Sequence, residues 1–392
     1  MNTFFISILR ELRRIRQRPR YFVLLTIGIV FSYVFFLTLM YEGQPEDLPV
    51  AVVDHDGSYL SRRLCHELTA TQGVKVVAVY DSHAEARKAM QRQEIYGFME
   101  IPEHTYSSLL DFERPHVAIY SNNAFLLAGS LSYKQLATMG KLASAAVHQE
   151  ILKKKGLDES AIMGIVQPVE FDTHLISNPT ANYQPYVLTT ILPGILAMMV
   201  LLLTAFEVTL EQKEGTAAQW LSTAKGNLVV AMLGKLLPYT FWFSMLGILG
   251  NIVFFGPCHY TLLGNFGLMV IDMILLVVAA QAMGVLIAGL IPDMHLAVCV
   301  SAIYSALSFS MSGFSYPVCS MPPALQAFSY IFPLRHYYLA YAEVALYGDG
   351  IAQCWPHFVM LLCLIICGFI GIALMDKQLK GSKGLTPTPL KR

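Results

Sequence analysis

Apolar runs of membrane length alternate with short polar breaks through the second half of the chain, and one further run lies near the N-terminus. About 20 apolar residues are enough for a helix to cross the hydrocarbon layer of a bilayer, because a helix rises about 1.5 Å per residue. The pattern therefore predicts six membrane-spanning helices, over residues 21–41, 187–206, 228–255, 262–290, 296–316 and 357–375.

The N-terminal 20 residues combine apolar residues at helical spacing with a group of arginines. The apolar positions are Phe4, Phe5, Ile8, Leu9, Leu12 and Ile15, and the interleaved cations are Arg10, Arg13, Arg14 and Arg16. This pattern predicts an amphipathic helix over residues 1–20 that lies flat in the membrane interface. A plain basic anchor is the alternative. The arginines predict a cytoplasmic N-terminus under either interpretation.

Residues 42–185 have the composition of a soluble domain and are too many for a loop between adjacent helices. Alternating apolar positions predict strands at 50–53, 74–80, 96–101, 117–120 and 165–171. Helical periodicity predicts helices at 59–69, 82–91 and 125–155, the second of them capped by Ser82. We expect a mixed α/β domain outside the cytoplasm, because the first helix leads the chain outward.

The remaining five predicted helices fall within residues 186–376. With six crossings, the C-terminal Lys377, Lys380 and Lys383 return to the side of the N-terminal arginines, in agreement with the positive-inside rule. A multi-pass protein of the inner, cytoplasmic membrane with both termini in the cytoplasm is expected. The tail, residues 377–392, is rich in Gly, Thr and Pro and is expected to be disordered.

An outer segment at residues 317–355 is too apolar for an ordinary loop. Pro317, Pro322, Pro323 and Pro333 divide it into pieces too short to cross a bilayer. Two short helices that enter the outer leaflet and turn back account for this composition, provided that protein covers the broken backbone. The alternative of a seventh and an eighth crossing requires charged and polar groups inside the bilayer, namely Arg335, His336 and Glu343.

A charged stretch at residues 207–226, EVTLEQKEGTAAQWLSTAKG, interrupts the apolar second half. It is expected to form a loop in the cytoplasm between the second and third crossings. The only charge in the run that follows is Lys235, which stands about two turns inside its helix and is expected to snorkel to the cytoplasmic face.

Composition supports a membrane protein and excludes several classes. Of 392 residues, 55% are hydrophobic and 14% are charged, compared with about a quarter charged in soluble domains. The formal net charge is zero, so no overall field favours nucleic acid. The seven cysteines show no metal-ligand spacing and no disulfide framework. We expect no metal site and no partner nucleic acid.

Motif fragments do not add up to a catalytic site. The segments that begin at Gly140-Lys141 and Gly234-Lys235 lack the first glycine and the hydroxyl of a phosphate-binding loop. His66-Glu67 lacks the second histidine of a zinc-protease motif. No catalytic residue is predicted, and the chain is not expected to bind and split ATP through a phosphate-binding loop.

Asp272 lies in the middle third of an apolar run, and an ionisable group within a membrane helix is costly and usually functional. Proton coupling is one interpretation. A hydrogen bond to a neighbouring helix is the other.

The order of these features resembles the membrane subunit of a type-2 ABC exporter. Three local stretches are similar to motifs of that family: Asn178-Pro179 with Tyr183 and Leu192-Pro193-Gly194, the loop Glu211 to Thr216, and the outer segment from Gly313 to Gly348. The long insertion after the first helix is typical of the drug-export-like branch. The loop departs from the family pattern, because Gln212 and Lys213 stand where an arginine usually lies between the glutamates.

The resemblance implies a permease that pairs with a second copy of itself and with separate ABC ATPase subunits. ATP and Mg²⁺ are bound on the ATPase, and a periplasmic adaptor and an outer-membrane channel are further candidate partners. It implies ATPase contacts at Glu211, Lys213, Glu214, Gly215 and Thr216, and a translocation path near Leu192, Pro193, Met198, Ser305, Ser308 and Ser312. The serines either face that path or pack helices closely.

The resemblance also implies that charge reversal at Glu211 and Glu214 uncouples ATP hydrolysis from transport without unfolding the protein. Two other classes fit parts of the pattern. A cell-envelope scaffold or sensor would use the outer domain to bind a partner, and an ion-coupled carrier would show inverted repeats. The charged stretch favours the exporter, because a scaffold needs no ATPase contact there. The substrate class, whether drug, lipid or peptide, stays open.

Overall fold

A computed structural model describes the chain except for residues 1–2, 112, 170–171, 173, 180 and 382–392. The chain divides into two compact units. The helical unit comprises Met1–Tyr41 and Leu175–Arg392, and the globular unit comprises Glu42–His174. The globular unit therefore ends at His174, 11 residues before the predicted boundary at residue 185.

The described residues include six helices that are long and apolar enough to cross a membrane, as the sequence predicts. These are α2 (Arg20–Leu39), α8 (Tyr183–Lys213), α10 (Leu228–Phe255), α11 (Phe266–Leu290), α12 (Met294–Met311) and α15 (Ile351–Gly381). Four of them start at an Asn or Asp whose side chain accepts a backbone N–H of the first turn. These caps are Asn182, Asn227, Asn265 and Asp293.

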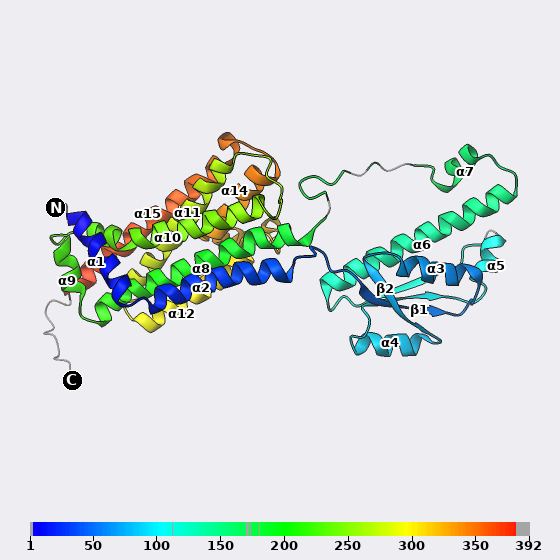
Figure 1. Cartoon of the computed structure of the whole chain (residues 1–392), viewed down its shortest axis with the longest axis horizontal. Coiled ribbons are helices and arrows are strands. Elements are labelled where there is room, and N and C mark those ends of the chain that lie inside the picture. Colours follow the sequence, from blue (N-terminus) through cyan, green and yellow to red (C-terminus); the bar gives the residue numbers. More distant parts are fainter. Residues whose placement is uncertain (1–2, 112, 170–171, 173, 180, 382–392) are drawn as a thin grey trace. The chain divides into compact units, whose positions relative to one another are not determined.

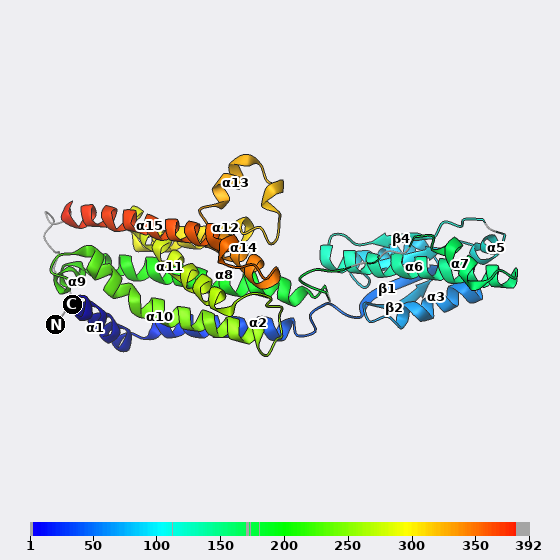
Figure 2. The ribbon, with the colours of Figure 1, turned by 90° about the horizontal axis from the view of Figure 1, so that it is seen from above.

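Helix α11 forms the centre of the helical unit, with α8 on one side and α15 on another (Figure 2). Small residues allow this close packing. A Cβ atom added to Gly289 would collide with the backbone of Gly371, and one added to Gly284 would meet the carbonyl oxygen of Leu201 at 2.9 Å. The sequence AAQAMGVLIAG of α11 thus specifies a helix surrounded by other helices.

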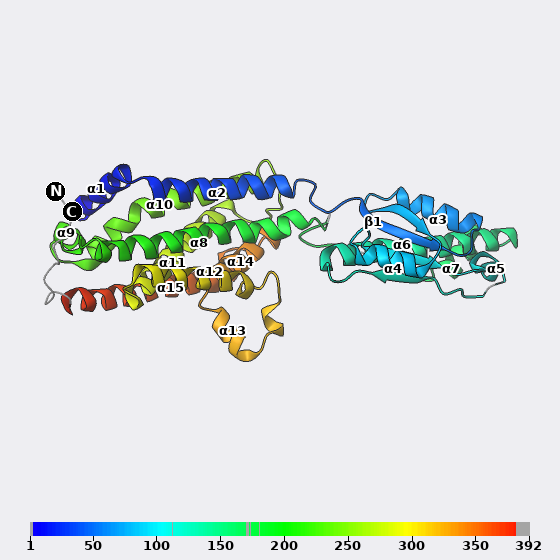
Figure 3. The same ribbon diagram turned by 90° about the horizontal axis from the view of Figure 1, so that it is seen from below.

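The outer segment folds into short helices, as predicted. After the 3₁₀ turn Val318–Ser320 come α13 (Pro323–Ser329), α14 (Pro333–Tyr341) and a π-helical turn, Ala342–Leu346. Figure 3 shows α13 standing away from the bundle and α14 lying against it. Helices of 7 and 9 residues are too short to cross a bilayer, so the fold does not support two additional crossings.

Two helices continue well past their predicted C-terminal ends. Helix α8 continues through Lys213, so residues 207–213 are helix and not loop, and α9 (Ala217–Thr223) occupies most of the remainder. Helix α15 also runs through Lys377 and Lys380 into the predicted disordered tail. The rest of that tail, with Lys383, lies outside the described residues.

The globular unit is a four-stranded mixed sheet with helices on both faces. Its strands are β1 (Leu48–Asp54), β2 (Val74–Tyr80), β3 (Gly97–Ile101) and β4 (Ala118–Ser121). Their order across the sheet is β2-β1-β3-β4, in which β1 pairs parallel with β2 and β3, and β4 is antiparallel to β3. The alternation of apolar residues correctly predicted all four strands.

Helices cover both faces of this sheet (Figure 1). Helices α3 (Tyr59–Thr69) and α6 (Leu126–Lys154) cover one face, and α4 (His83–Gln91) covers the other; α5 (Thr105–Leu110) follows β3. The predicted fifth strand at 165–171 is wrong over its described part. Ile165 and Val166 end helix α7 (Glu159–Val166), because apolar Ile162 and Ile165 recur at helical spacing and Ile162 is buried.

Candidate functional site

Charged side chains from three helices meet at the end of the helical unit where α1 (Thr3–Gln17) and α9 lie (Figure 2). Two ladders of opposite charge face each other there. Helix α1 and the residue after it supply Arg10, Arg14 and Arg18 at four-residue spacing, and α8 and the residue after it supply Glu207, Glu211 and Glu214. Spacings of three and four place each ladder on one face of its helix.

The buried and partly buried members of this site are six residues, which we call the ion cluster: Arg10, Glu11, Arg14, Glu207, Glu211 and Lys235. Glu211 lies at its centre with no exposed surface. The Arg10 guanidinium binds both oxygens of Glu211 at 3.0 Å, and Arg14 binds Oε1 as well. Two N–H donors on two carboxylate oxygens form the strong bidentate geometry.

Lys235 enters the ion cluster from α10 and is only 1% exposed. Its Nζ lies 3.0 Å from Glu211, 3.3 Å from Glu11 and 3.5 Å from Glu207. The Tyr239 hydroxyl donates to Glu11 at 2.8 Å. The expectation that Lys235 snorkels to the surface is wrong, because these carboxylates replace the water that its ammonium group would otherwise seek.

Charge balance explains why the ion cluster can be buried. Three cations face three carboxylates. Arg14 and Lys235 each contact more than one carboxylate, and Arg10 binds both oxygens of Glu211. At the rim, Glu214 binds Arg18 and lies 3.5 Å from Arg14. Burial alone lowers the pKa of Arg14, but the neighbouring carboxylates, Glu211 foremost, outweigh it and the pKa is raised. The guanidinium therefore stays charged.

The short helix α9 is attached to the ion cluster. Gly215 turns the chain with a φ of 70°, and the backbone N–H of Thr216 donates to the Glu211 carbonyl at 3.0 Å. The indole of Trp220 donates to the Ala231 carbonyl at 3.2 Å, with the Lys235 ammonium 5.7 Å from its ring centre. The Ser7 and Thr223 hydroxyls lie 3.0 Å apart, so α9 is also hydrogen-bonded to α1.

One face of α9 stays open. Ala218, Gln219, Ser222 and Lys225 are exposed there. The site therefore has two layers: an exposed surface on α9, and a buried ion cluster that connects this surface to α1, α8 and α10.

The predicted ATPase-contact residues fall into different environments. Glu211 is buried by its own chain, whereas Lys213 is exposed and its Nζ lies 3.1 Å from His295 Nε2. Glu214 is partly exposed at the rim, with Gly215 and Thr216 in the turn beside it. Reversing the charge of Glu211 would bury a surplus of cations, so the expectation that this change leaves folding intact does not fit the geometry.

The arginines of the interfacial helix also divide into two pairs. Arg10 and Arg14 belong to the ion cluster, whereas Arg13 and Arg16 are exposed. The ATPase contact and the interfacial position of α1 stay predictions.

The residues of the predicted translocation path pack closely between helices. Met198, Ser305 and Ser308 line a cavity of only about 20 Å³ between α8, α12 and α14. Leu192, Pro193 and Ser312 are buried outside it. The Ser305 hydroxyl donates to the Ser301 carbonyl at 2.9 Å, within its own helix. Both roles considered for the serines, lining a path and packing helices, stay predictions.

Asp272 is 1% exposed in α11, and neither carboxyl oxygen has a hydrogen-bond partner among the described residues. The hydrogen bond to a neighbouring helix that the sequence suggests is therefore not formed in this conformation. Asp272 lies apart from the ion cluster, and its role in coupling stays a prediction.

Comparisons with known proteins agree with the membrane architecture. The family model described as "ABC-2 family transporter protein" matches residues 20–374. Two similar proteins are the "Probable multidrug ABC transporter permease YbhR" of Escherichia coli strain K12 and that of Escherichia coli O157:H7. Each is 20% identical over 357 residues, which cover 91% of this chain and 93% of the relative.

Proposed function

Because the chain belongs to the ABC-2 family of transporters and is a type-2 ABC permease subunit, we propose that it forms the membrane path of an ATP-driven exporter and receives work from a separate ATPase at α9. The ion cluster is the observation that carries this proposal. It connects α9, which has one exposed face, to the adjoining ends of α1, α8 and α10, as a coupling element requires.

The proposed mechanism starts on the ATPase, which binds ATP and Mg²⁺. Closure of two ATPase subunits pushes on the exposed face of α9 around Gln219. Because α9 is hydrogen-bonded to Ser7 of α1, to Glu211 of α8 and, through Trp220, to Ala231 of α10, these three helices move together with it. This motion shifts the equilibrium between inward-open and outward-open arrangements of the membrane helices.

We further propose that two copies of the chain pair, with α8 and α12 toward the dimer centre. In the inward-open state the small cavity near Met198, Ser305 and Ser308 would widen into the path. A cytoplasmic position for both termini in the inner membrane is supported by the even number of candidate spans and by the arginines of α1. The globular unit would then lie outside the cytoplasm, where an adaptor and an outer-membrane channel would be reached.

Substrate export is proposed, with drug-like molecules as the first compounds to test. The name of the similar permease, "Probable multidrug", supports that choice. The two alternative classes predict different results: a scaffold or sensor moves no substrate, and an ion-coupled carrier moves substrate without ATP.

Site-specific photo-crosslinking tests the docking surface. The photoreactive residue p-benzoylphenylalanine is placed at Gln219 on α9, or at the exposed Ala324 on α13 as the control. We expect irradiation of native membranes to join the Gln219 variant, and not the Ala324 variant, to a protein with a phosphate-binding loop, identified by mass spectrometry. If such a protein is crosslinked at neither position, the proposal is contradicted.

A further inference from the structure

The strand order of the globular unit predicts where a ligand would bind. From β1 the chain passes through α3 to β2 on one side, and it then returns through α4 to β3 on the other side of β1. Helices α3 and α4 cover opposite faces (Figure 1). The connection that leaves β1 and the connection that reaches β3 therefore run on opposite faces of the sheet, so the strand order reverses between β1 and β3. Ligands of open parallel sheets bind at such a reversal, outside the carboxyl ends of the strands.

A cavity of about 880 Å³ lies at that point. Asp56 follows the end of β1, Thr105 follows the end of β3, and both line it. Its volume falls within the range of about 300–1,000 Å³ that is typical of small-molecule sites. All of its lining residues belong to the globular unit, so the cavity does not depend on how the two units are arranged.

The walls of the cavity are largely apolar. Leu60 and Leu64 of α3 face Met99 and Ile101 of β3, and Gly140 lies on α6. A Cβ atom added at Gly140 would find only the Met99 Cε atom nearby, at 3.6 Å. Space is therefore left where any other residue would place a side chain.

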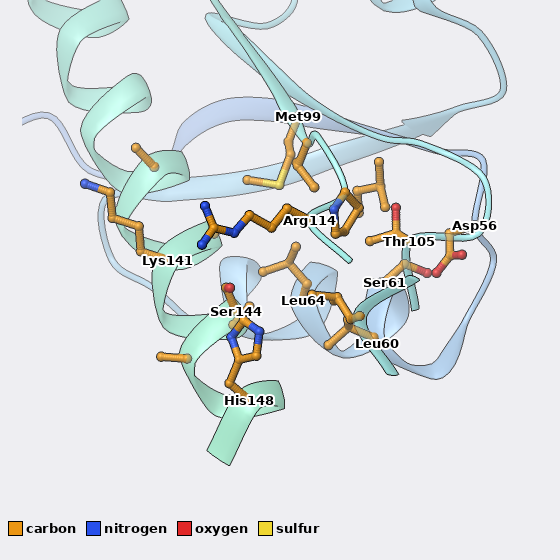
Figure 4. Close-up of a pocket in the computed structure, with 18 of the residues that line it drawn as sticks. Asp56, Leu60, Ser61, Leu64, Met99, Thr105, Arg114, Lys141, Ser144 and His148 are labelled. Atoms are coloured by element: carbon orange, nitrogen blue, oxygen red, sulfur yellow. The ribbon is translucent and has the colours of Figure 1, made fainter. Parts of the chain in front are cut away.

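Cationic and polar groups gather at one end. Figure 4 shows the Arg114 side chain crossing the cavity toward α6, where Lys141, Ser144 and His148 are placed, whereas Asp56 lies at the opposite end. Among the described residues, Arg114 and Lys141 have no ion pair or side-chain hydrogen bond. The adjacent Glu113 is exposed and also lines the cavity.

We propose that this cavity binds an anionic amphiphile. The apolar body of the ligand lies between α3 and the sheet, and its carboxylate or similar anion is bound by Arg114, with Lys141 and His148 beside it. An arginine fork matches the two oxygens of a carboxylate, and the apolar walls match an acyl or aryl body. This site is separate from the coupling site and does not depend on ATP.

Hydrogen exchange measured by mass spectrometry tests the proposal on the full-length protein in lipid nanodiscs. The probes are decanoate, its neutral counterpart decanol and cationic decyltrimethylammonium, because all three carry the same ten-carbon chain and differ in the charge of the head group. We expect decanoate alone to slow exchange in peptides of α3, α5 and α6. Local protection distinguishes binding in the cavity from partition into lipid.

Two variants and a matched control complete the test. Arg114→Gln with Lys141→Gln removes the anion-binding charges, and Gly140→Leu fills the space; each is expected to weaken decanoate protection by about tenfold or more. Lys88→Gln with Lys134→Gln removes the same charge from exposed positions outside the cavity and should leave protection unchanged.

The proposal is overturned if decanoate gives no protection in residues 42–174. It is equally overturned if decanol protects as well as decanoate does, or if the Arg114 and Lys141 variant binds decanoate as tightly as the control variant.

Discussion

The ion cluster and the cavity of the globular unit both gather cationic side chains, but the partners of these side chains differ. Arg10 and Lys235 face carboxylates of their own chain at 3.0 Å. Arg114 faces an open apolar space. Charges that find partners within the chain hold its helices together, whereas a cation with no internal partner beside a cavity is available to a ligand.

This difference also determines what each region can do. Removing one member of a buried ion network leaves an uncompensated charge, so the ion cluster resists rearrangement and can transmit motion as a unit. The cavity contains no such network among the described residues, and the charge of Arg114 is not needed to hold the sheet together. Loss of stability should therefore accompany changes in the first region, and loss of binding should accompany changes in the second.

Lys235→Ala is expected to have the largest effect. It leaves three buried carboxylates with two arginines and should lower the free energy of unfolding by about 3–5 kcal/mol. Chemical unfolding of the purified protein in nanodiscs measures this change. Lys213→Ala, at an exposed position, is the control and should stay within about 0.5 kcal/mol. Equal, small effects of both variants would contradict the assignment of Lys235 to the ion cluster.

Tyr239→Phe should have the next largest effect. It removes the hydroxyl that donates to the Glu11 carboxylate at 2.8 Å, and a hydrogen bond to a charged group contributes about 1.5–3 kcal/mol. Tyr33→Phe is the matched control, because the Tyr33 hydroxyl is buried with no hydrogen-bond partner among the described residues. The same unfolding measurement should show a loss for Tyr239→Phe alone. A loss of similar size in both would show that the bond to Glu11 adds nothing.

Gly140→Leu, in the globular unit, should raise local stability, whereas the two preceding substitutions lower the stability of the helical unit. Replacing glycine within α6 by a good helix former, at a position with free space, should raise local stability by about 1 kcal/mol. Hydrogen exchange of α6 peptides measures the opening free energy. A decrease in that free energy would mean that the space beside Met99 is not open.

The arginines of α1 provide a comparison within one helix, in which Arg13→Gln has the smallest effect expected of any variant here. Arg13→Gln, at an exposed position, should change stability by less than about 0.5 kcal/mol. Arg10→Gln removes the bidentate pair with Glu211 and should cost about 1.5–3 kcal/mol. Limited proteolysis of α1, followed over time, would reveal faster cleavage only in Arg10→Gln. Indistinguishable cleavage rates would argue against a docked α1.

The sequence predicted the membrane helices and the four strands because hydrophobic periodicity is a local signal. The ion cluster was missed, although its signal was present: Glu207, Glu211 and Glu214 recur at helical spacing, and so do Arg10 and Arg14. The prediction of a loop after residue 206 concealed that the three glutamates lie on one face of a helix. Once α8 is extended to Lys213, the carboxylates align and Lys235 has a place to be buried.

The cavity could not be predicted from sequence, because it depends on strand order. Val50 pairs with both Val76 and Gly97, and nothing local to Val50 selects these neighbours. In the sequence, the dipeptide Gly140-Lys141 resembles only a fragment of a phosphate-binding loop. Gly140 and Lys141 reach the cavity wall only because α6 packs on the sheet, which is a long-range contact. Arg114 reaches the same cavity from the segment before β4.

A distance measurement between two copies of the chain most directly tests whether the ion cluster carries motion. Nitroxide labels are attached at Ser310→Cys, an exposed position on α12, in a variant without the native cysteines. The protein is reconstituted with its ATPase, and the distance between labels is compared with and without ATP, Mg²⁺ and vanadate. We expect the distance between labels to change on addition of ATP, Mg²⁺ and vanadate in the protein without further substitution and in Arg13→Gln. In Arg10→Gln we expect the distance to stay the same, although the ATPase is still bound. The same change of distance in Arg10→Gln would contradict the claim that the ion cluster carries motion.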